Sequence, residues 1–166
     1  MEAEGFERGQ GKPAGGVEAI WLVPCEGVQE AAFLNGACTS ITLREGYRFA
    51  RYDFTEGSAV YSQHLEGTQP LQAVVHELSF SMPWSDCGAV AAAADLASGG
   101  CAAIILTAAG TALVAGISPL FGCECPLRAA ETAADTRAEY DDDAYASVTL
   151  RSLDVSFSAP YTGAMP

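Results

Sequence analysis

The stretch that decides the fold lies between Leu71 and Met82 and reads LQAVVHELSFSM. Its apolar and polar side chains alternate, which predicts a strand with one face against a core. The face with the larger apolar side chains holds Val74, His76, Leu78, Phe80 and Met82. Working back from it, Ala59–Leu65 (AVYSQHL) predicts a second strand, and Glu66-Gly67-Thr68 predicts a turn between the two. Two strands joined by a short glycine turn indicate a β-hairpin.

Two further strands are predicted upstream of this hairpin. Val17–Val23 (VEAIWLV) is apolar at nearly every position, which is typical of a strand buried on both faces. Tyr47–Phe54 (YRFARYDF) is rich in aromatic residues and interrupted by charges, so it fits a strand with one solvated face. Residues 25–40 fit no single pattern, and Thr39–Leu43 fits a short strand.

The periodicity changes from that of a strand to that of a helix after Pro83. Ser85 is a suitable N-cap, and Asp86 places a negative charge in the first turn, where it favours the helix dipole. Cys87–Ala97 is rich in alanine, and Ser98-Gly99-Gly100 ends the segment. The sequence therefore predicts one helix at this point.

A second hairpin is predicted after the helix. Cys101–Thr107 and Thr111–Ile117 are apolar runs joined by a three-residue loop, in which Gly110 is expected to take a positive φ.

The last third of the chain predicts up to two more strands and a loop. Leu120–Ala130 fits one further strand, and Ala133–Ala144 is so rich in acidic residues that it predicts an exposed loop. Tyr145–Phe157 alternates well and predicts the final strand, with Val148 and Leu150 on its apolar face.

About seven alternating runs against one helix predict an α+β, β-rich fold, built as an antiparallel β-sandwich or a distorted barrel with one helix packed on a sheet. The length of 166 residues fits one domain around a single core. Residues 1–16 hold five glycines and charges of both signs, which predicts a flexible N-terminal arm. Residues 17–166 then form the single β-rich domain.

The charge balance excludes several classes of partner. Asp and Glu total 21 against 8 Lys and Arg, giving a formal net charge of -13, and Lys12 is the only lysine. Eight Lys and Arg side chains cannot neutralise many phosphate groups. Tight nucleic-acid binding is therefore not expected. Binding to anionic lipid is disfavoured for the same reason.

No secretory or membrane segment is predicted. The start of the chain (MEAEGFERGQGKPAGG) has neither a cationic first part nor an apolar core. Leu96–Cys123 carries no charge, but it contains several glycines and Pro119 and lacks the flanking Lys/Arg bias of a membrane span. Without a signal, the six cysteines are predicted to be free thiols of a cytosolic protein.

Two residue pairs could bind metal or take part in catalysis, and both fit a structural role better. Cys123 and Cys125 supply two thiolates where a structural zinc needs four ligands, so they are predicted to be small thiols at a strand turn. His64 and His76 lie on neighbouring predicted strands and could approach each other across the hairpin. Because His76 falls on the apolar face, we expect a satisfied, half-buried residue rather than a base or a ligand.

Two other motifs fail on spacing. Asp141-Asp142-Asp143 lacks the ligand spacing of an EF-hand loop and predicts a solvated acidic loop. Gly9-Gln10-Gly11-Lys12 resembles a phosphate-binding loop, but Pro13 stands where the metal-binding Ser or Thr should be. The sequence therefore predicts no catalytic, cofactor-binding or metal-binding residue, no cofactor and no enzymatic activity.

From Leu71 onward the order of elements is similar to that of a known family. A long alternating strand (LQAVVHELSFSMP) leads to a capped helix (SDCGAVAAAADLASGG), a hairpin (CAAIILTAAGTALVAGISPL), an acidic turn and a final strand (VTLRSLDVSFSAPYTG). This order, over Leu71–Met165, resembles structural proteins of tailed bacteriophages carried as prophages in gut bacteria, particularly small tail or head–tail-joining proteins. The resemblance implies a non-enzymatic subunit of a homo-oligomeric ring or tube. Such a subunit meets other virion structural proteins, first in the cytoplasm and then in the virion.

The residues themselves are compatible with such an assembly. Sheet edges pair readily with copies of themselves, and a glycine-rich arm can become ordered on a neighbouring subunit. An acidic lumen would let DNA pass without binding it. The alternative is a small soluble ligand-binding β-barrel or sandwich with a pocket lined by Trp21, Trp84 or tyrosines. A third possibility is a secreted domain held together by disulfides.

Overall fold

The computed structural model describes residues 14–83, 88, 91, 95, 98–136 and 144–166. The described part is β-rich, and every strand pairing in it is antiparallel. The elements are β1 (Val17–Pro24), the 3-10 turn η1 (Cys25–Gly27), β2 (Val28–Leu34), β3 (Ala37–Leu43), β4 (Ala50–Tyr52), β5 (Val60–Thr68), β6 (Leu71–Pro83), β7 (Cys101–Thr107), β8 (Ala112–Ala115), β9 (Arg128–Asp135) and β10 (Tyr145–Asp154).

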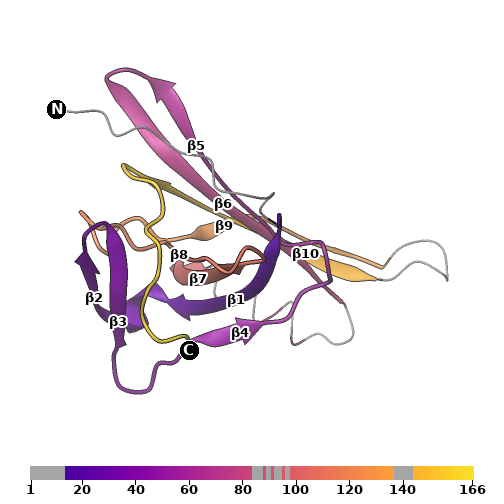
Figure 1. The fold of residues 1–166 in the computed structure, drawn as a ribbon. Helices are drawn as coiled ribbons and strands as arrows, with labels where there is room; N and C mark the ends of the chain where they lie inside the picture. The colour runs from indigo at the N-terminus through magenta and orange to yellow at the C-terminus, as the bar shows by residue number, and fades with distance from the viewer. Residues whose placement is uncertain (1–13, 84–87, 89–90, 92–94, 96–97, 137–143) are drawn as a thin grey trace.

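The strands form three layers that resemble a sandwich with an added hairpin (Figure 1). One four-stranded sheet has the order β4-β1-β7-β8, and a second has the order β5-β6-β10-β9. The β2-β3 hairpin is a two-stranded sheet of its own. Both faces of the β4-β1-β7-β8 sheet contribute to hydrophobic cores, so this sheet is the middle layer.

The larger core fills the space between the two four-stranded sheets. Phe80 is 2% exposed there, and its ring meets the ring of Tyr52 edge-on at a centroid distance of 6.1 Å. Within the β6-β10 pairing, Phe80 lies opposite Val148 and Leu78 lies opposite Leu150. Most of the remaining buried side chains of this core are Ile20, Leu22, Met82, Cys101, Ala103, Ile105, Ala115 and Leu127.

The smaller core lies on the other face of the middle sheet. Val23 of β1 and Ala102 of β7 pack there against apolar side chains of the β2-β3 hairpin, including Phe33 and Ile41. Because β1 lies between β4 and β7 and is covered on both faces, the prediction of a doubly buried strand at Val17–Val23 is confirmed.

The C-terminal segment, residues 155–166, joins the three layers. The Val114 amide donates to the Ala159 carbonyl at 3.0 Å and the Tyr161 amide donates to the Ala112 carbonyl at 2.8 Å, so the segment covers the edge of β8. The Cys38 amide donates to the Pro160 carbonyl at 2.8 Å, which ties β3 to the same segment.

The strands with the clearest alternation are where the sequence predicts them. The strands β6, β7 and β10 match the predicted runs, and the even-numbered side chains of β6 from Val74 to Met82 are buried. The hairpin loop between β7 and β8 contains Gly110 at φ 84°, as predicted.

Three predicted boundaries differ from the structure. Only Ala50–Tyr52 of the predicted strand Tyr47–Phe54 is a strand. The β5-β6 turn is at Gln69-Pro70, not at Glu66-Gly67-Thr68, because β5 continues to Thr68 opposite Leu71. The strand predicted at Leu120–Ala130 is instead β9, which begins at Arg128 and runs into the predicted acidic loop.

Three predictions fall largely outside the described residues. The described positions 88, 91 and 95 of the predicted helix are helical, and so are 98 and 99, where the helix was predicted to end. The predicted N-cap Ser85 lies outside the described part. Most of the predicted arm and Asp141-Asp142-Asp143 also lie outside it. No helix in the described part is long and apolar enough to cross a membrane.

Candidate functional site

The densest group of chemically active side chains lies where β5, β6 and the C-terminal segment meet. The Tyr61 hydroxyl is 2.8 Å from Nδ1 of His76, and the Ser158 hydroxyl is 3.2 Å from the same nitrogen. The two hydroxyl groups also contact each other. On the opposite side of the ring, Nε2 of His76 lies 2.9 Å from the Ser156 carbonyl oxygen.

These contacts fix the protonation of His76. A carbonyl oxygen can only accept a hydrogen bond, so Nε2 carries the proton and donates a hydrogen bond to the Ser156 carbonyl oxygen. This leaves Nδ1 of the neutral ring as an acceptor for the hydroxyl groups. Burial lowers the pKa of His76 and outweighs the opposing effects of the Ser156 carbonyl and Asp154. Burial is also the main reason why the pKa of Tyr61 rises to about 12. The group is therefore uncharged near pH 7.

A nucleophilic serine normally needs a histidine that is itself oriented by an acid. Here the second ring nitrogen of His76 binds a main-chain carbonyl, and Tyr61 competes with Ser158 for the first. The Ser158 amide also donates to Oε1 of Gln63 at 2.8 Å. What the arrangement does best is hold residues 156–158 against the β5-β6-β10-β9 sheet.

The structure overturns the idea that His64 and His76 could meet. In the β5-β6 register His76 lies opposite Gln63, and His64 lies opposite Val75. Neighbouring positions of a strand point to opposite faces, so the two imidazoles are on different sides of the sheet. His76 is buried, whereas His64 is exposed.

The lowered pKa of His76 makes stability depend on pH. In the unfolded chain His76 takes up a proton near pH 6.5, whereas in the folded chain it does so only at a lower pH. The free energy of unfolding should therefore fall as the pH drops below about 6.5. We expect a loss of up to about 1.4 kcal/mol per pH unit, the limit for one proton. Urea unfolding at pH 7.5 and pH 5.5 measures it.

Two single variants separate His76 from the other titrating groups. His76→Gln should be less stable at pH 7.5 and should lose most of this pH dependence, whereas His64→Gln should keep it. An unchanged slope in His76→Gln would show that another group is responsible.

Cys123 and Cys125 lie, half-buried, between β8 and β9. Within the described residues, no group of three or more His, Cys, Asp or Glu side chains is placed to hold a metal ion. Trp21, which the ligand-binding alternative would use, is half-buried beneath the Arg51 guanidinium, 6.0 Å from the ring centre. Trp84 is outside the described residues.

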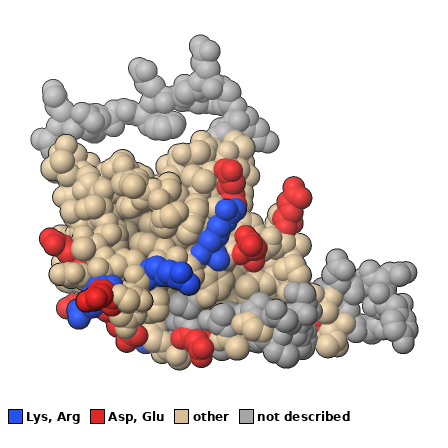
Figure 2. All heavy atoms as spheres, turned by 90° about the horizontal axis from the view of Figure 1, so that it is seen from below, with Lys and Arg blue, Asp and Glu red and all other residues tan. Residues whose placement is uncertain are grey.

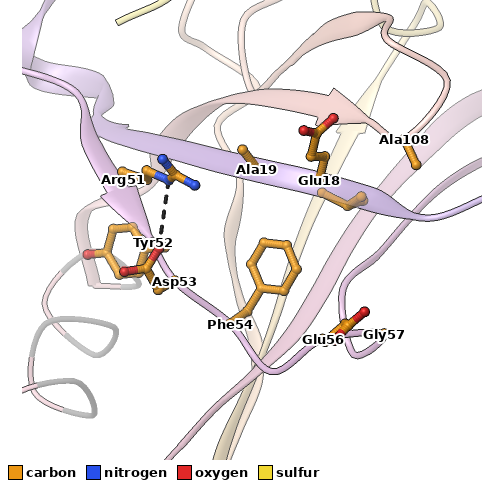
Figure 3. Close-up of a pocket in the computed structure, with 10 residues that line it drawn as sticks. Glu18, Ala19, Arg51, Tyr52, Asp53, Phe54, Glu56, Gly57 and Ala108 are labelled. Atoms are coloured by element: carbon orange, nitrogen blue, oxygen red, sulfur yellow. Dashed lines mark ion pairs between the residues drawn. The ribbon is translucent and has the colours of Figure 1, made fainter.

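A surface pocket of about 560 Å³ lies between β1 and the segment that follows β4 (Figure 3). Its polar lining consists mainly of Glu18, Asp53 and Glu56 with Arg51, and Nε of Arg51 is 3.7 Å from Oδ1 of Asp53. Both of these side chains are mostly exposed, so their charges remain solvated. The pocket offers no desolvated, convergent polar groups of the kind that fix a small ligand.

The surface that is built most like an interface is the β5-β6 hairpin with the strand edge beside it. The hairpin projects beyond the body of the molecule (Figure 1). It carries Leu65, which is 56% exposed, and Leu71, which is 85% exposed, while Val155 and Phe157 after β10 are also exposed. The sequence pattern identifies the hairpin, but not that its tip lies outside the core.

Two edges of the β5-β6-β10-β9 sheet are open. Neither the outer edge of β5 nor that of β9 is joined to another strand in the part of the chain that the structure describes. In the middle sheet, β4 is only three residues long and the C-terminal segment covers β8. The seven-residue strand β2 also has one edge without a partner, so the two longest open edges in the described part of the chain belong to the β5-β6-β10-β9 sheet.

The charged groups form no separate basic surface on the face shown in Figure 2, where basic side chains lie beside acidic ones. The Arg151 guanidinium also forms an ion pair with the Glu66 carboxylate at 2.8 Å, between β10 and β5. No protein-family model, no curated protein and no solved structure matches this chain.

Proposed function

We propose that the chain is a non-enzymatic structural subunit that self-associates through the edges of the β5-β6-β10-β9 sheet. The observation that carries this proposal is that, among the strands that the structure describes, one sheet ends in two long and unlike strands that pair with no further strand, β5 with nine residues and β9 with eight. Uncovered edges of this length present main-chain N–H and C=O groups that a second copy can pair with.

The inequality of the two edges favours a ring or a tube. If β5 of one copy pairs with β9 of the next, the contact is head-to-tail and leaves a free β5 and a free β9 at the ends. Such contacts repeat until the chain of subunits closes or extends as a helix. Pairing of β5 with β5 would instead stop at a dimer.

The side chains of β5 support its role as one half of the contact. Proteins that stay monomeric guard edge strands with charges, proline or short length. The strand β5 has a single acidic residue, Glu66, and it exposes Val60 and Leu65. Burial of such side chains in a contact with another copy would stabilise the assembly, because it removes apolar surface from water.

The type of assembly follows from the resemblance to tail and head–tail-joining proteins of phages. A net charge of -13 suits a ring through which DNA passes, because like charges repel. In this proposal the partners are further copies and other virion proteins, and assembly begins in the cytoplasm. The neutral Tyr61-His76-Ser158 group serves to anchor the C-terminal segment.

We also propose that the helix containing positions 88, 91, 95, 98 and 99 packs on the β4 end of the middle sheet. Asp95 and Ser98 line a pocket together with Pro24 and Glu26, which supports a position of the helix beside the middle sheet. Asp95 also raises the pKa of Tyr52 in β4, after the larger effects of burial and the Cys101 thiol.

Leu65→Lys tests the edge contact. A charge at this exposed position should cost the folded monomer little, because surface changes are usually within about 0.5 kcal/mol. In the assembly it would remove a buried leucine and add a charge to the edge, so we expect association at least roughly tenfold weaker. Size-exclusion chromatography with light scattering measures the association.

Leu34→Lys is the matched control, because it makes the same change at a 64% exposed position beside the β2-β3 turn. It should assemble like the unmodified protein. Equal assembly of both variants would place the contact elsewhere. A stable monomer that binds a small metabolite tightly would favour the ligand-binding alternative.

A further inference from the structure

Two thiols from distant parts of the chain meet in the smaller core. Cys25 begins η1 directly after β1, and Cys123 lies in the segment between β8 and β9. Both pack against the same cluster of buried residues, which includes Val23, Val114 and Ile117. Their side chains are hydrogen-bonded to each other.

Main-chain hydrogen bonds hold both cysteines in place. The Cys25 amide donates to the Gly100 carbonyl at 3.1 Å, and its Sγ lies 3.8 Å from the Gly116 carbonyl oxygen. On the other side, Ser118 and Gly122 exchange two amide–carbonyl hydrogen bonds of 2.7 and 2.8 Å just before Cys123. The contact between the thiols is therefore a feature of the folded backbone.

Accessibility separates this pair from two of the other described cysteines. Cys25 and Cys123 are half-buried, whereas Cys38 and Cys101 are fully buried. Cys125 is also half-buried, but the hydrogen bond of Cys123 is to Cys25 and not to this neighbour in sequence. The partial exposure of both thiols allows a small thiol reagent to reach the pair, and the two thiols interact with each other.

We propose that Cys25 and Cys123 are a redox site that forms a reversible disulfide by exchange with a low-molecular-weight disulfide such as oxidised glutathione. The Cys123 thiolate attacks one sulfur of the oxidised glutathione, breaks its S–S bond and releases one glutathione thiolate. The Cys25 thiol then loses its proton and attacks the Cys123 sulfur, which expels the second glutathione. The two cysteines are oxidised by two electrons, and one glutathione disulfide is reduced to two thiols.

The hydrogen bond between the thiols assigns the order of these steps. The interaction with Cys25 lowers the pKa of Cys123 to about 7, so Cys123 is the thiol that reacts first. The same contact raises the pKa of Cys25, which becomes the resolving thiol.

The disulfide would join the base of the β2-β3 hairpin to the segment before β9. It would close a loop of about 100 residues, a length at which a cross-link restricts the unfolded chain strongly. For a chain of this size, we expect Tm to rise by roughly 5–15 °C on oxidation.

The test uses the full-length protein equilibrated with mixtures of reduced and oxidised glutathione, followed by alkylation and peptide mapping. The reduced protein has six cysteines to alkylate, and we expect the oxidised protein to retain four and to contain one Cys25–Cys123 disulfide. Thermal unfolding of the same samples measures the change in Tm.

Three variants make the assignment specific. Cys125→Ser should form the same disulfide with the same gain in Tm. Cys25→Ser and Cys25→Ala should instead keep a glutathione on Cys123 and show no gain in Tm. A disulfide that maps to Cys123 and Cys125, or six free thiols in the unmodified protein after oxidation, would overturn the proposal.

Discussion

Gly116→Ala is expected to lower the free energy of unfolding by about 3–4 kcal/mol, because it combines backbone strain with a clash against main chain. Gly116 follows β8 with φ at 80°, a conformation that costs an L-residue about 1–2 kcal/mol. A Cβ added there would also lie 2.5 Å from the Cys101 carbonyl oxygen and 3.1 Å from Cα of Ala102. Both atoms belong to the backbone of β7, so alanine is accommodated only if a central strand moves.

Gly110→Ala is the control for the strain alone. Gly110 has nearly the same φ, 84°, but a Cβ there would meet nothing within 4 Å. We expect a loss of about 1 kcal/mol, measured by chemical denaturation of both variants. If the two glycines cost the same, the close approach between the end of β8 and the start of β7 is wrong.

Phe80→Ala is expected to cost about 3–5 kcal/mol, because it leaves a large cavity between the two four-stranded sheets. The Phe80 ring is almost fully buried, lies opposite Val148 and contacts the Tyr52 ring edge-on. Neighbours such as Val148 of β10 and Tyr52 of β4 would have to move to refill the space. Denaturant unfolding followed by tryptophan fluorescence gives the change.

Phe157→Ala makes the same change at a position that is 53% exposed, beyond the end of β10. It should cost less than about 1 kcal/mol, since little buried surface is lost. Similar losses in both variants would contradict the packing of β6 against the middle sheet.

The strands that could be predicted from sequence are those whose alternation is set by the core. Leu78, Phe80 and Met82 repeat every second residue because β6 has one face on the larger core. The apolar residues of β1 are continuous because β1 has a core on each side, so the sequence indicates a central strand but not its neighbours. Pairing between β1 and β7 joins residues some 80 positions apart, which no local pattern encodes.

One missed element did have a local signal. Residues 25–40 fit no single pattern, yet Asn35 and Gly36 take positive φ values of 52° and 79° in a two-residue turn between β2 and β3. Asn-Gly is the preferred pair for that turn, and it would have identified the hairpin. The predicted strand Tyr47–Phe54 was too long because its aromatic residues pack from irregular backbone, as Phe49 and Phe54 do.

The polar group around His76 was only partly predictable. Alternation placed His76 on the apolar face of β6, where it is buried. Its partner Ser158 lies 82 residues away on a segment without regular structure, and Tyr61 reaches it through the β5-β6 register. That His64 and His76 point to opposite faces follows from alternation only once the β5-β6 register is known, and the sequence does not give this register.

Sedimentation velocity of the intact chain over a series of concentrations tests self-association most directly. The account predicts either a discrete closed oligomer or a series of oligomers that keeps growing with concentration, in equilibrium with the 17.2 kDa subunit. A single species with the mass of the subunit at every concentration would contradict it, and so would a dimer that grows no further.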